Sequence, residues 1–374
     1  MNLSEVQVDR AQLVRNARAL MTLVGSETTT IAVVKGNAYG HGLAEVVKAL
    51  DPVVGGFQVD DIEELRAVRA VSAKRTLVLG YVSREDIREA VSLGGELAIY
   101  DTERLPFIQA AGTRAGVRAK VHLKIDALLG RQGVVPDDLN AMIAALKACP
   151  EIELLSAYAH FANIEDTTDL GHAYEQLEVF DACWSLLRAQ GWPDLGRHVS
   201  ATSGLMTVES GNDMVRLGLG IYGMYPSASL ARRHVDLDLK PALRWVSHLA
   251  QVKTLPARHP VGYGLTFITP REMRIGIVPQ GYADGYDRGL SNSGEVLVRG
   301  HRCSVLGRIA MNMFAIDLSH VEDASPEDEV VLLGPQAQEQ ITPEEIASRL
   351  GTINYEVTTR ISPLLPRRAV LLVH

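Results

Sequence analysis

The sequence has few cysteines, no long apolar stretch and no excess of basic residues, and each of these shortages excludes a class of protein. Its three cysteines are odd in number and far apart in 374 residues, so neither a disulfide framework nor a C-x-x-C metal site is indicated. No stretch approaches the ~18 uninterrupted apolar residues of a membrane helix, and the chain does not open with a basic region followed by an apolar one. We therefore expect a soluble, cytoplasmic protein without a signal peptide, with reduced thiols and no metal.

Acidic residues outnumber basic ones, which leaves a net charge of −8 and a pI near 5.8. Proteins with general affinity for nucleic acid or anionic membranes carry a basic surface, so neither partner is expected. The hydrophobic content of 47% lets a chain of this length bury a large core. Length and composition together predict two domains, or one barrel with an addition, acting on a small molecule.

Short apolar runs alternate with longer segments of helical periodicity in the first part of the chain, as in repeated βα units. The runs are Ile31–Val34, Phe57–Val59, Thr76–Leu79, Leu97–Tyr100, Val117–Ile125, Leu154–His160 and Met214–Tyr222. Asp60–Ala70 and Thr168–Gln190 have apolar residues at three- and four-residue intervals and predict helices. A (β/α)8 barrel needs ~250 residues, so the pattern predicts an α/β barrel over about residues 8–230, with its site at the carboxyl ends of the strands.

The pattern changes after Ser227 to short strands divided by Gly, Pro and Asp turns. The expected strands are Val246–Leu255, Met273–Pro279, Glu295–Val298, Arg302–Leu306, Ala315–Leu318 and Glu329–Leu333, with one helix at Pro343–Leu350. Residues 231–374 are therefore expected to form a mainly β C-terminal domain. The Ser- and Ala-rich segment Pro226–Arg233 is the expected junction.

Lys35 lies where a run of four apolar residues ends and a glycine-rich turn begins. Ile31–Val34 predict a buried strand, and Gly36, Gly40 and Gly42 would let the backbone approach a ligand closely. A lysine that emerges from an apolar strand is desolvated, which favours the free amine that attacks a carbonyl. The alternative is a lysine at a strand end that keeps its charged head in water. The segment makes Lys35 a candidate for Schiff-base chemistry.

The segment Val34–Gly42 also resembles the pyridoxal-phosphate lysine motif of alanine racemases, and further motifs of that family follow in order over nearly the whole chain. The resemblance implies a fold-type III enzyme in which Lys35, on the first barrel strand, holds pyridoxal 5'-phosphate. It implies that Tyr39 contacts the cofactor phosphate. It also implies that residues 1–7, with Val6–Val8 as a strand, pack on the C-terminal domain.

Arg131 follows an expected strand, where a guanidinium on a barrel can bind a carboxylate through two parallel hydrogen bonds. The matching arginine of alanine racemases binds the substrate carboxylate and is often supported by a carbamylated lysine, which corresponds to Lys124. Ala127–Leu129 stands where the family usually has Thr-Gly-Met. A surface ion pair is the alternative interpretation of Arg131.

His160 ends another apolar run, and the resemblance implies that it packs on the cofactor ring; a core histidine is the alternative. By the same resemblance, Ser203, Gly218 and Leu219 hold the phosphate, in the region where such barrels commonly bind one. Arg216 would face the pyridine nitrogen. Because the pKa of an arginine exceeds about 12, it would not give up its proton to that nitrogen, which limits side reactions such as transamination. A buried structural ion pair is the alternative for Arg216.

Tyr263, between two glycines, resembles the tyrosine of the family that reaches into the active site of a partner subunit. An exposed loop aromatic is the alternative. Racemisation removes a proton from one face of a carbon and returns it to the other, so an acid/base group is needed on each side. Lys35 and Tyr263 would take these two places in a homodimer with shared active sites.

Three further segments match the family, namely Gly281–Gly285, Arg308–Asn312 and Ile353–Glu356. The resemblance implies that the backbone N–H of Met311 contacts the substrate carboxylate and that Tyr355 contacts the phosphate. Tyr282 and Glu165 would line the entrance from across the dimer. Asn312 stands where the family usually has Asp, which would change the charge at the entrance.

The resemblance predicts an alanine racemase that interconverts L- and D-alanine and supplies D-alanine for peptidoglycan. A racemase of broader or serine-type specificity remains open, because specificity depends on pocket shape. A decarboxylase of the same architecture and a non-catalytic pyridoxal-phosphate carrier are further alternatives, as is a barrel whose lysine reacts directly with sugars.

Overall fold

The computed structural model describes residues 4–165 and 167–372. The chain divides into two compact units, and each is considered by itself. Residues 13–36 and 46–239 form a barrel unit. Residues 37–45 and the chain from Lys240 onward form a β-rich unit together with the N-terminal segment that ends at Gln12. No helix among the described residues is long and apolar enough to span a membrane.

The barrel unit contains eight parallel strands in the order β8-β7-β6-β5-β4-β3-β2-β9. Their bounds are β2 Thr29–Val33, β3 Gly56–Val59, β4 Thr76–Val78, β5 Gly95–Ile99, β6 Ala119–Lys124, β7 Ile152–Tyr158, β8 Gly196–His198 and β9 Met214–Leu217. Backbone hydrogen bonds from Asp213 N to Arg197 O (3.0 Å) and from Arg216 N to Ser200 O (3.1 Å) link the two ends of this sheet. The predicted (β/α)8 barrel is confirmed.

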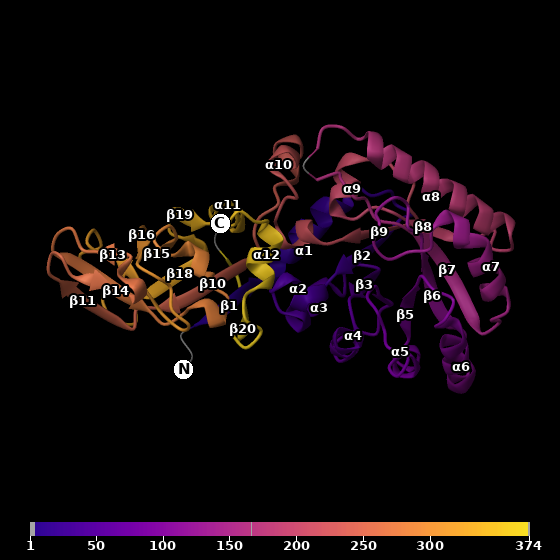
Figure 1. Ribbon diagram of the computed structural model, residues 1–374, viewed down its shortest axis with the longest axis horizontal. Helices are drawn as coiled ribbons and strands as arrows, with labels where there is room; N and C mark the ends of the chain where they lie inside the picture. The colour runs from indigo at the N-terminus through magenta and orange to yellow at the C-terminus, as the bar shows by residue number, and fades with distance from the viewer. Residues whose placement is uncertain (1–3, 166, 373–374) are drawn as a thin grey trace. The chain divides into compact units, whose positions relative to one another are not determined.

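Helices alternate with these strands, and α4 to α8 lie outside them (Figure 1). The helices up to Leu239 are α1 Arg10–Met21, α2 Lys35–Tyr39, α3 Leu43–Leu50, α4 Ile62–Arg69, α5 Ile87–Ser92, α6 Leu105–Ala115, α7 Leu139–Lys147, α8 Gly171–Ala189, α9 Thr202–Thr207 and α10 Ala228–Arg233. Strands covered on both faces are apolar along their length. Every residue of β3 and β5 is accordingly buried, including Glu96.

The β-rich unit is built on a sheet in the order β11-β14-β17-β16-β15-β18-β10-β1-β20, with β19 paired to β18. Its strands are β1 Glu5–Asp9, β10 Leu243–His248, β11 Gln251–Leu255, β12 Pro260–Val261, β13 Phe267–Ile268, β14 Met273–Val278, β15 Glu295–Val298, β16 His301–Leu306, β17 Phe314–Asp317, β18 Glu329–Gln336, β19 Glu339–Ile341 and β20 Arg367–Val370. Two helices follow β19, α11 Pro343–Leu350 and α12 Asn354–Thr359. β1 pairs with both β10 and β20, so strands from opposite ends of the chain are neighbours.

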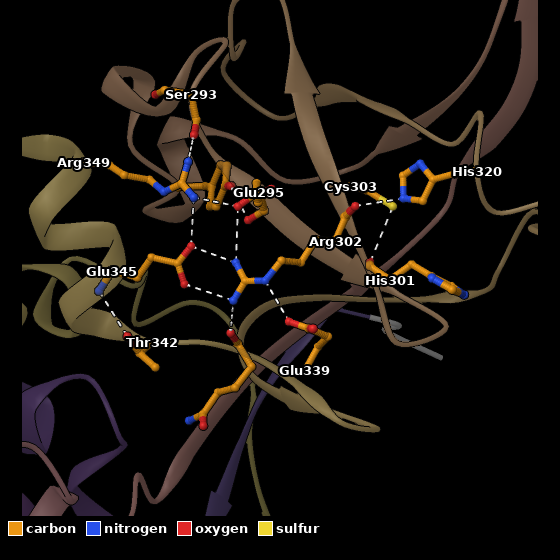
Figure 2. Close-up of polar contacts among 12 residues, drawn as sticks. Ser293, Glu295, His301, Arg302, Cys303, His320, Glu339, Thr342, Glu345 and Arg349 are labelled. Atoms are coloured by element: carbon orange, nitrogen blue, oxygen red, sulfur yellow. Dashed lines mark hydrogen bonds and ion pairs between the residues drawn. The ribbon is translucent and has the colours of Figure 1, made fainter.

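An ion-pair network joins the strands of this unit to α11 (Figure 2). Arg302 on β16 contacts Glu295, Glu339 and Glu345 at 2.8–3.2 Å. Arg349 on α11 contacts Glu295 at 2.6 Å and Glu345 at 2.9 Å. Glu295 and Glu345 each contact both arginines, and Glu339 contacts Arg302, so the network connects β15, β16, β19 and α11. Such connections suit a structural role. The network lies among side chains that solvent partly reaches, so its stabilisation is modest.

Several elements differ from the sequence-based expectation. Val246–Leu255 is two strands, because the chain turns at Leu249 and Ala250. The short β8 was not expected, since Gly196–His198 has no apolar run, and neither was α12, which is rich in β-branched residues. Pro226–Arg233 contains helix α10 rather than only loop.

Candidate functional site

Lys35 begins a short helical turn whose following residues have left-handed backbone angles. φ is 63° at Gly36, 52° at Asn37, 53° at Tyr39 and 84° at Gly40. A left-handed stretch costs about 1–2 kcal/mol per residue for side chains other than glycine, and strain of this kind is concentrated at functional sites. The turn ends β2 abruptly and directs the chain away from the barrel strand immediately after the lysine.

The expectation that Lys35 is desolvated was wrong for the chain by itself. Its side chain is 43% exposed, and Nζ lies 3.6 Å from Oδ1 of Asp60, which follows β3. The continuous run of buried residues that includes β2 ends at Val34, so the side chain of Lys35 lies beyond the buried part of the strand. Sequence periodicity detects the buried strand but not an acidic neighbour that comes from the next strand.

The second half of the lysine motif is fixed within the β-rich unit. The rings of Tyr39 and Tyr355 lie with centroids 6.1 Å apart. Gly40 approaches α12 so closely that a Cβ at this position would lie 2.0 Å from the carbonyl oxygen of Thr358. The guanidinium of Arg367 donates to the carbonyl oxygen of Gly40 at 2.9 Å. The two tyrosines predicted to contact phosphate are therefore neighbours.

Four cations gather around His160 in the barrel unit. Burial, followed by the positive charges of Arg216 and Arg131, lowers the pKa of His160 to about 3, and Lys124 and Lys35 act in the same direction. The histidine is therefore neutral at physiological pH. Burial and the charges of Arg131 and Arg216 also lower the pKa of Lys124 to about 8. The charges of Lys35, Lys124, Arg131 and Arg216 thus all act on His160, and Arg216 Nη2 lies 3.5 Å from its Nδ1.

Arg216 is almost fully buried and is held by carbonyl groups. Its guanidinium donates to the carbonyl oxygens of Ala159 (3.0 Å), Val199 (3.0 Å) and His198 (2.8 Å), and to Nδ1 of His198. Burial lowers the pKa of Arg216 to about 10, so the side chain still carries its charge at neutral pH. These partners are carbonyl groups and a ring nitrogen, so Arg216 does not form the buried ion pair that was the alternative.

The expected phosphate-binding residues follow β8 and β9. The backbone N–H of Gly218 donates to Thr202 Oγ1 at 3.0 Å, and Leu219 begins the next turn. The hydroxyl of Ser203 donates to Glu165 Oε1 at 2.8 Å. Glu165, expected at the entrance, thus lies beside an expected phosphate ligand of its own chain. Thr202, which orients Gly218, was not identified from the sequence, although it adjoins Ser203.

Gln176 is a second residue that the motifs did not identify. This buried side chain on α8 donates to the carbonyl oxygens of Ala127 (2.6 Å) and His160 (3.2 Å) and accepts from the backbone N–H of Ala162 (2.9 Å). It therefore joins the loop that leads to Arg131 to the loop that carries His160. Only its place on the inner face of a long amphipathic helix could have indicated this role.

Tyr263 projects from a short turn in the β-rich unit. It is 73% exposed, and the glycines on either side of it have φ of 73° and 72°. A Cβ on Gly264 would lie 3.0 Å from Nε of Arg308, so a guanidinium adjoins this turn. Arg308, the first residue of the Arg308–Asn312 motif, therefore lies beside the turn that carries Tyr263.

Met311 and Tyr282 lie on two segments that pack together in the same unit. The backbone N–H of Tyr282 donates to the carbonyl oxygen of Ala310 (3.2 Å), and that of Ala283 donates to the carbonyl oxygen of Met311 (3.0 Å). Gly281 permits this approach, because a Cβ there would lie 2.3 Å from both of these carbonyl oxygens. Both side chains are about half exposed.

The barrel residues fit a ligand that carries negative charge and polar ring substituents. Lys35, Lys124, Arg131 and Arg216 supply cations, and two of them are buried. The ring of Tyr158 lies under the Arg216 guanidinium, 5.5 Å from Cζ to the ring centroid, and its buried hydroxyl has no hydrogen-bond partner among the described residues. Buried polar groups without a partner are costly, so this hydroxyl is available to a bound molecule. The donor set suits a phosphate and a carboxylate together.

Comparison with known proteins identifies relatives over nearly the full length. The family described as "Alanine racemase, N-terminal domain" matches residues 8–226, and "Alanine racemase, C-terminal domain" matches residues 242–369. Alanine racemase 2 of Caldanaerobacter subterraneus is 35% identical over 368 residues, which cover 97% of this chain and 94% of that protein. The alanine racemase of Desulfosudis oleivorans is 36% identical over 374 residues, 96% of this chain and 95% of that protein.

Solved structures give the same result. The crystal structure of alanine racemase from D-cycloserine-producing Streptomyces lavendulae superposes with a TM-score of 0.93 at 32% identity, covering 99% of this chain and 97% of that chain. The alanine racemase of Bacillus anthracis with bound L-Ala-P superposes with a TM-score of 0.92 at 30% identity, covering 99% and 95%.

Proposed function

Because the chain belongs to the alanine racemase family, we propose that it interconverts L-alanine and D-alanine in a homodimer with pyridoxal phosphate on Lys35. Its D-alanine would supply peptidoglycan synthesis. The observation that supports the proposal is that the charges of Lys35, Arg131 and Arg216 all act on one buried, neutral histidine, His160. That set matches the chemistry of the substrate and of the cofactor.

The barrel residues would hold the cofactor at several points. Lys35 would hold it through its amine, His160 would pack against its ring, and Arg216 would donate an N–H to its ring nitrogen. When bound, pyridoxal phosphate withdraws electrons from the substrate α-carbon and acidifies its C–H bond. Arg216 keeps its own proton, because its pKa of about 10 is far above that of a pyridine nitrogen.

The phosphate would be bound mainly by neutral donors. Ser203 offers its hydroxyl, Gly218 and Leu219 offer backbone N–H groups, and Tyr39 and Tyr355 offer phenol groups. For Ser203 this requires its hydroxyl to exchange Glu165 for the phosphate. Carboxylate and phosphate are both anionic acceptors, so the Ser203 hydroxyl would make a charge-assisted hydrogen bond before and after the exchange.

The substrate carboxylate would be oriented by Arg131 and by the backbone N–H of Met311. Lys124 supports Arg131 if its amine is carbamylated, because the cation then becomes an anion. The lowered pKa of about 8 favours this modification, since only the free amine reacts with carbon dioxide. Without it, two cations would face each other beside the substrate.

Lys35 and Tyr263 would move the proton at the α-carbon, one on each face. Tyr263 would come from the partner subunit, with Tyr282 and Glu165 at the entrance. The high exposure of Tyr263 in a single chain supports this role, because a side chain that acts on another subunit must project from its own.

Borohydride reduction and peptide mapping test the cofactor assignment. We expect the reduced cofactor on the peptide that contains Lys35, and its loss in Lys35→Ala. Lys120→Ala, which changes an exposed lysine on β6, is the matched control and should keep the label. Label on another lysine of the wild-type protein would overturn the assignment.

Asn312 supports a second candidate, a racemase of broader range. This residue adjoins Met311 and is neutral where the family usually has a carboxylate. A less acidic entrance would discriminate less between side chains. Comparable rates of racemisation for L-alanine, L-serine and L-lysine would favour this candidate.

A further inference from the structure

A continuous series of hydrogen bonds runs through the barrel interior behind Arg216. His198 Nε2 lies 3.0 Å from Ser156 Oγ, Ser156 Oγ lies 2.6 Å from His122 Nδ1, and His122 Nε2 lies 2.9 Å from Glu96 Oε2. All five side chains, Arg216 included, are at most 4% exposed. They come from the adjacent strands β5, β6, β7 and β8 and from β9 (Figure 1).

An irregularity in strand pairing places Ser156 in this series. Val121 on β6 pairs with Leu154 on β7, but the next residue, His122, pairs with Ser156. Leu155 is therefore an extra residue on β7, as in a β-bulge, and such bulges redirect side chains beside active sites. Without the shift, the position opposite His122 would belong to Leu155.

The direction of each hydrogen bond follows from Arg216, which can only donate. His198 Nδ1 must accept from it, so the proton of this neutral ring is on Nε2 and is donated to Ser156. The Ser156 hydroxyl is then free to donate to His122 Nδ1, and His122 donates its own Nε2–H to Glu96. Every donor in the series finds an acceptor, and every ring has one defined tautomer.

The charges agree with this assignment. Burial lowers the pKa of both His122 and His198, so both rings are neutral. Burial alone would raise the pKa of Glu96, but hydrogen bonds from His122 and Arg75 outweigh it and lower the value to about 2. Arg75 Nη2 lies 2.7 Å from Glu96 Oε2. The series therefore ends on a carboxylate that is ionised at all physiological pH values.

The charge of Arg216 has no direct counter-ion, because no carboxylate among the described residues lies within ion-pair distance of its guanidinium. Its neighbours include the cation Lys124 and the neutral His160. Hydrogen bonds in a series polarise one another, so the charge of Glu96 can stabilise the guanidinium through the intervening rings. The same series of hydrogen bonds fixes the plane of the His198 ring, and thus the position of Arg216.

We propose that Glu96, His122, Ser156 and His198 form a positioning relay that fixes the orientation of Arg216. The Ser156 hydroxyl is its main link, because its contacts of 2.6 and 3.0 Å are shorter than the direct contact of 3.4 Å between His198 Nε2 and His122 Nδ1. The role of Arg216 rests on the proposed function, whereas the tautomers of the relay do not. This difference allows the two proposals to fail separately.

Nitrogen-15 NMR of histidine-labelled protein tests the relay directly, with and without pyridoxal phosphate. We expect His122 and His198 to be neutral with the proton on Nε2 at neutral pH in both preparations, assigned by the loss of each signal in single histidine variants. A protonated imidazolium, or a proton on Nδ1 of His198, would overturn the relay even in a fully active racemase. A protein without racemase activity but with these tautomers would overturn the proposed function alone.

Ser156→Thr and Ser156→Val form a matched pair, because the two side chains have nearly the same volume and only threonine keeps the hydroxyl. In Ser156→Val we expect His122 to populate both tautomers and kcat to fall about tenfold relative to Ser156→Thr, with KM nearly unchanged. Identical ring signals and kcat in the two variants would contradict the proposal.

Glu96→Gln provides a second readout if neither serine variant folds. Glutamine keeps an acceptor for His122 but removes the charge, so we expect the tautomers to persist while kcat falls. An unchanged kcat together with unchanged tautomers would show that the charge of Glu96 does not reach Arg216.

Discussion

Single residues in the barrel interior have unusual protonation equilibria because cationic and titratable groups are buried there close together. Lys124 has a pKa of about 8, His160 one of about 3 and Arg216 one of about 10, each lowered by burial and, for the first two, by neighbouring cations. Perturbed values of this kind are concentrated at functional sites. Glu96 differs in cause, since burial would raise its pKa and the hydrogen bonds from His122 and Arg75 lower it by stabilising the carboxylate.

Glu96 makes stability depend on acid pH. Its pKa is about 2 in the folded state, against an ordinary value of 4.5 for this carboxyl, so its contribution is present above pH 4.5 and is lost as the pH falls toward 2. The shift corresponds to about 3 kcal/mol of unfolding free energy. We expect urea unfolding between pH 7 and pH 3 to show a steeper loss for the wild-type protein than for Glu96→Gln. Equal slopes would contradict the assignment.

Tyr263→Phe should remove catalysis without affecting the fold. Because the side chain is 73% exposed, we expect the free energy of unfolding to change by less than about 0.5 kcal/mol. Loss of one acid/base group should lower kcat by about 10²- to 10⁴-fold. The control is Tyr174→Phe, which changes an exposed tyrosine on α8 and should keep full activity. Turnover by Tyr263→Phe at the wild-type rate would exclude the two-base role.

Short motifs predicted the proposed catalytic residues, Lys35 with its neighbouring glycines and Tyr263 between two glycines. They did not identify Ser156, His198 or Gln176. The roles of these three depend on a strand irregularity, on barrel closure and on the face of a long helix, none of which leaves a short pattern in the sequence.

At the level of elements, the left-handed turn after Lys35 is tightly constrained. It needs glycine both for its backbone angles and for close approach to another element. Gly40 has φ of 84° and packs against the carbonyl group of Thr358 on α12. This contact fixes the turn that carries Tyr39.

Gly40→Ala should therefore destabilise the protein more than an ordinary glycine replacement. Gly116 has φ of 66°, and a Cβ added there would meet no atom within 4 Å, so this glycine is the matched control. We expect about 1 kcal/mol for Gly116→Ala from backbone strain alone, and at least about 3 kcal/mol for Gly40→Ala, since the Thr358 carbonyl must also move. Thermal and urea unfolding measure both. Equal losses would mean that the Thr358 contact relaxes at no cost.

Long apolar strands and amphipathic helices were predictable because burial on both faces or on one face gives a clear periodicity. β8 and β20 were not, because Gly196–His198 and Arg367–Val370 contain charged residues and form strands only through their neighbours. α11 was predicted with its exact bounds, since Thr342 and Gly351 are strong helix-end residues.

At the level of the whole molecule, the β-rich unit exposes many large apolar side chains. Tyr263, Leu265, Ile268, Met311 and Ile353 are each more than half exposed. Exposed apolar residues in such number favour association with another protein. They support the proposed homodimer, whose active sites would combine Lys35 of one subunit with Tyr263 of the other.

Mixed dimers test this shared arrangement. If Lys35→Ala and Tyr263→Phe subunits are dissociated, mixed and allowed to reassociate, half of the dimers should be mixed, and each of these has one intact and one doubly defective site. We expect recovery of about one quarter of the wild-type activity from two inactive variants. No recovery, with mixed dimers verified by mass spectrometry, would place Tyr263 in the active site of its own subunit.

The change from a barrel to a mainly β unit was predictable from the change in pattern. The contribution of residues 37–45 to the β-rich unit was not predictable. That segment overlaps the lysine motif, and contacts with residues more than 300 positions away, such as Arg367, keep it in the β-rich unit.

Proton exchange at the α-carbon tests the central claim most directly. Purified protein with pyridoxal phosphate is incubated in deuterated water with L-alanine, L-serine or L-lysine, and loss of the α-proton and formation of the D-enantiomer are followed together. We expect rapid exchange and D-alanine formation with L-alanine, and much slower reaction with the other two. Absence of exchange with L-alanine, in protein that has bound the cofactor, would contradict the account.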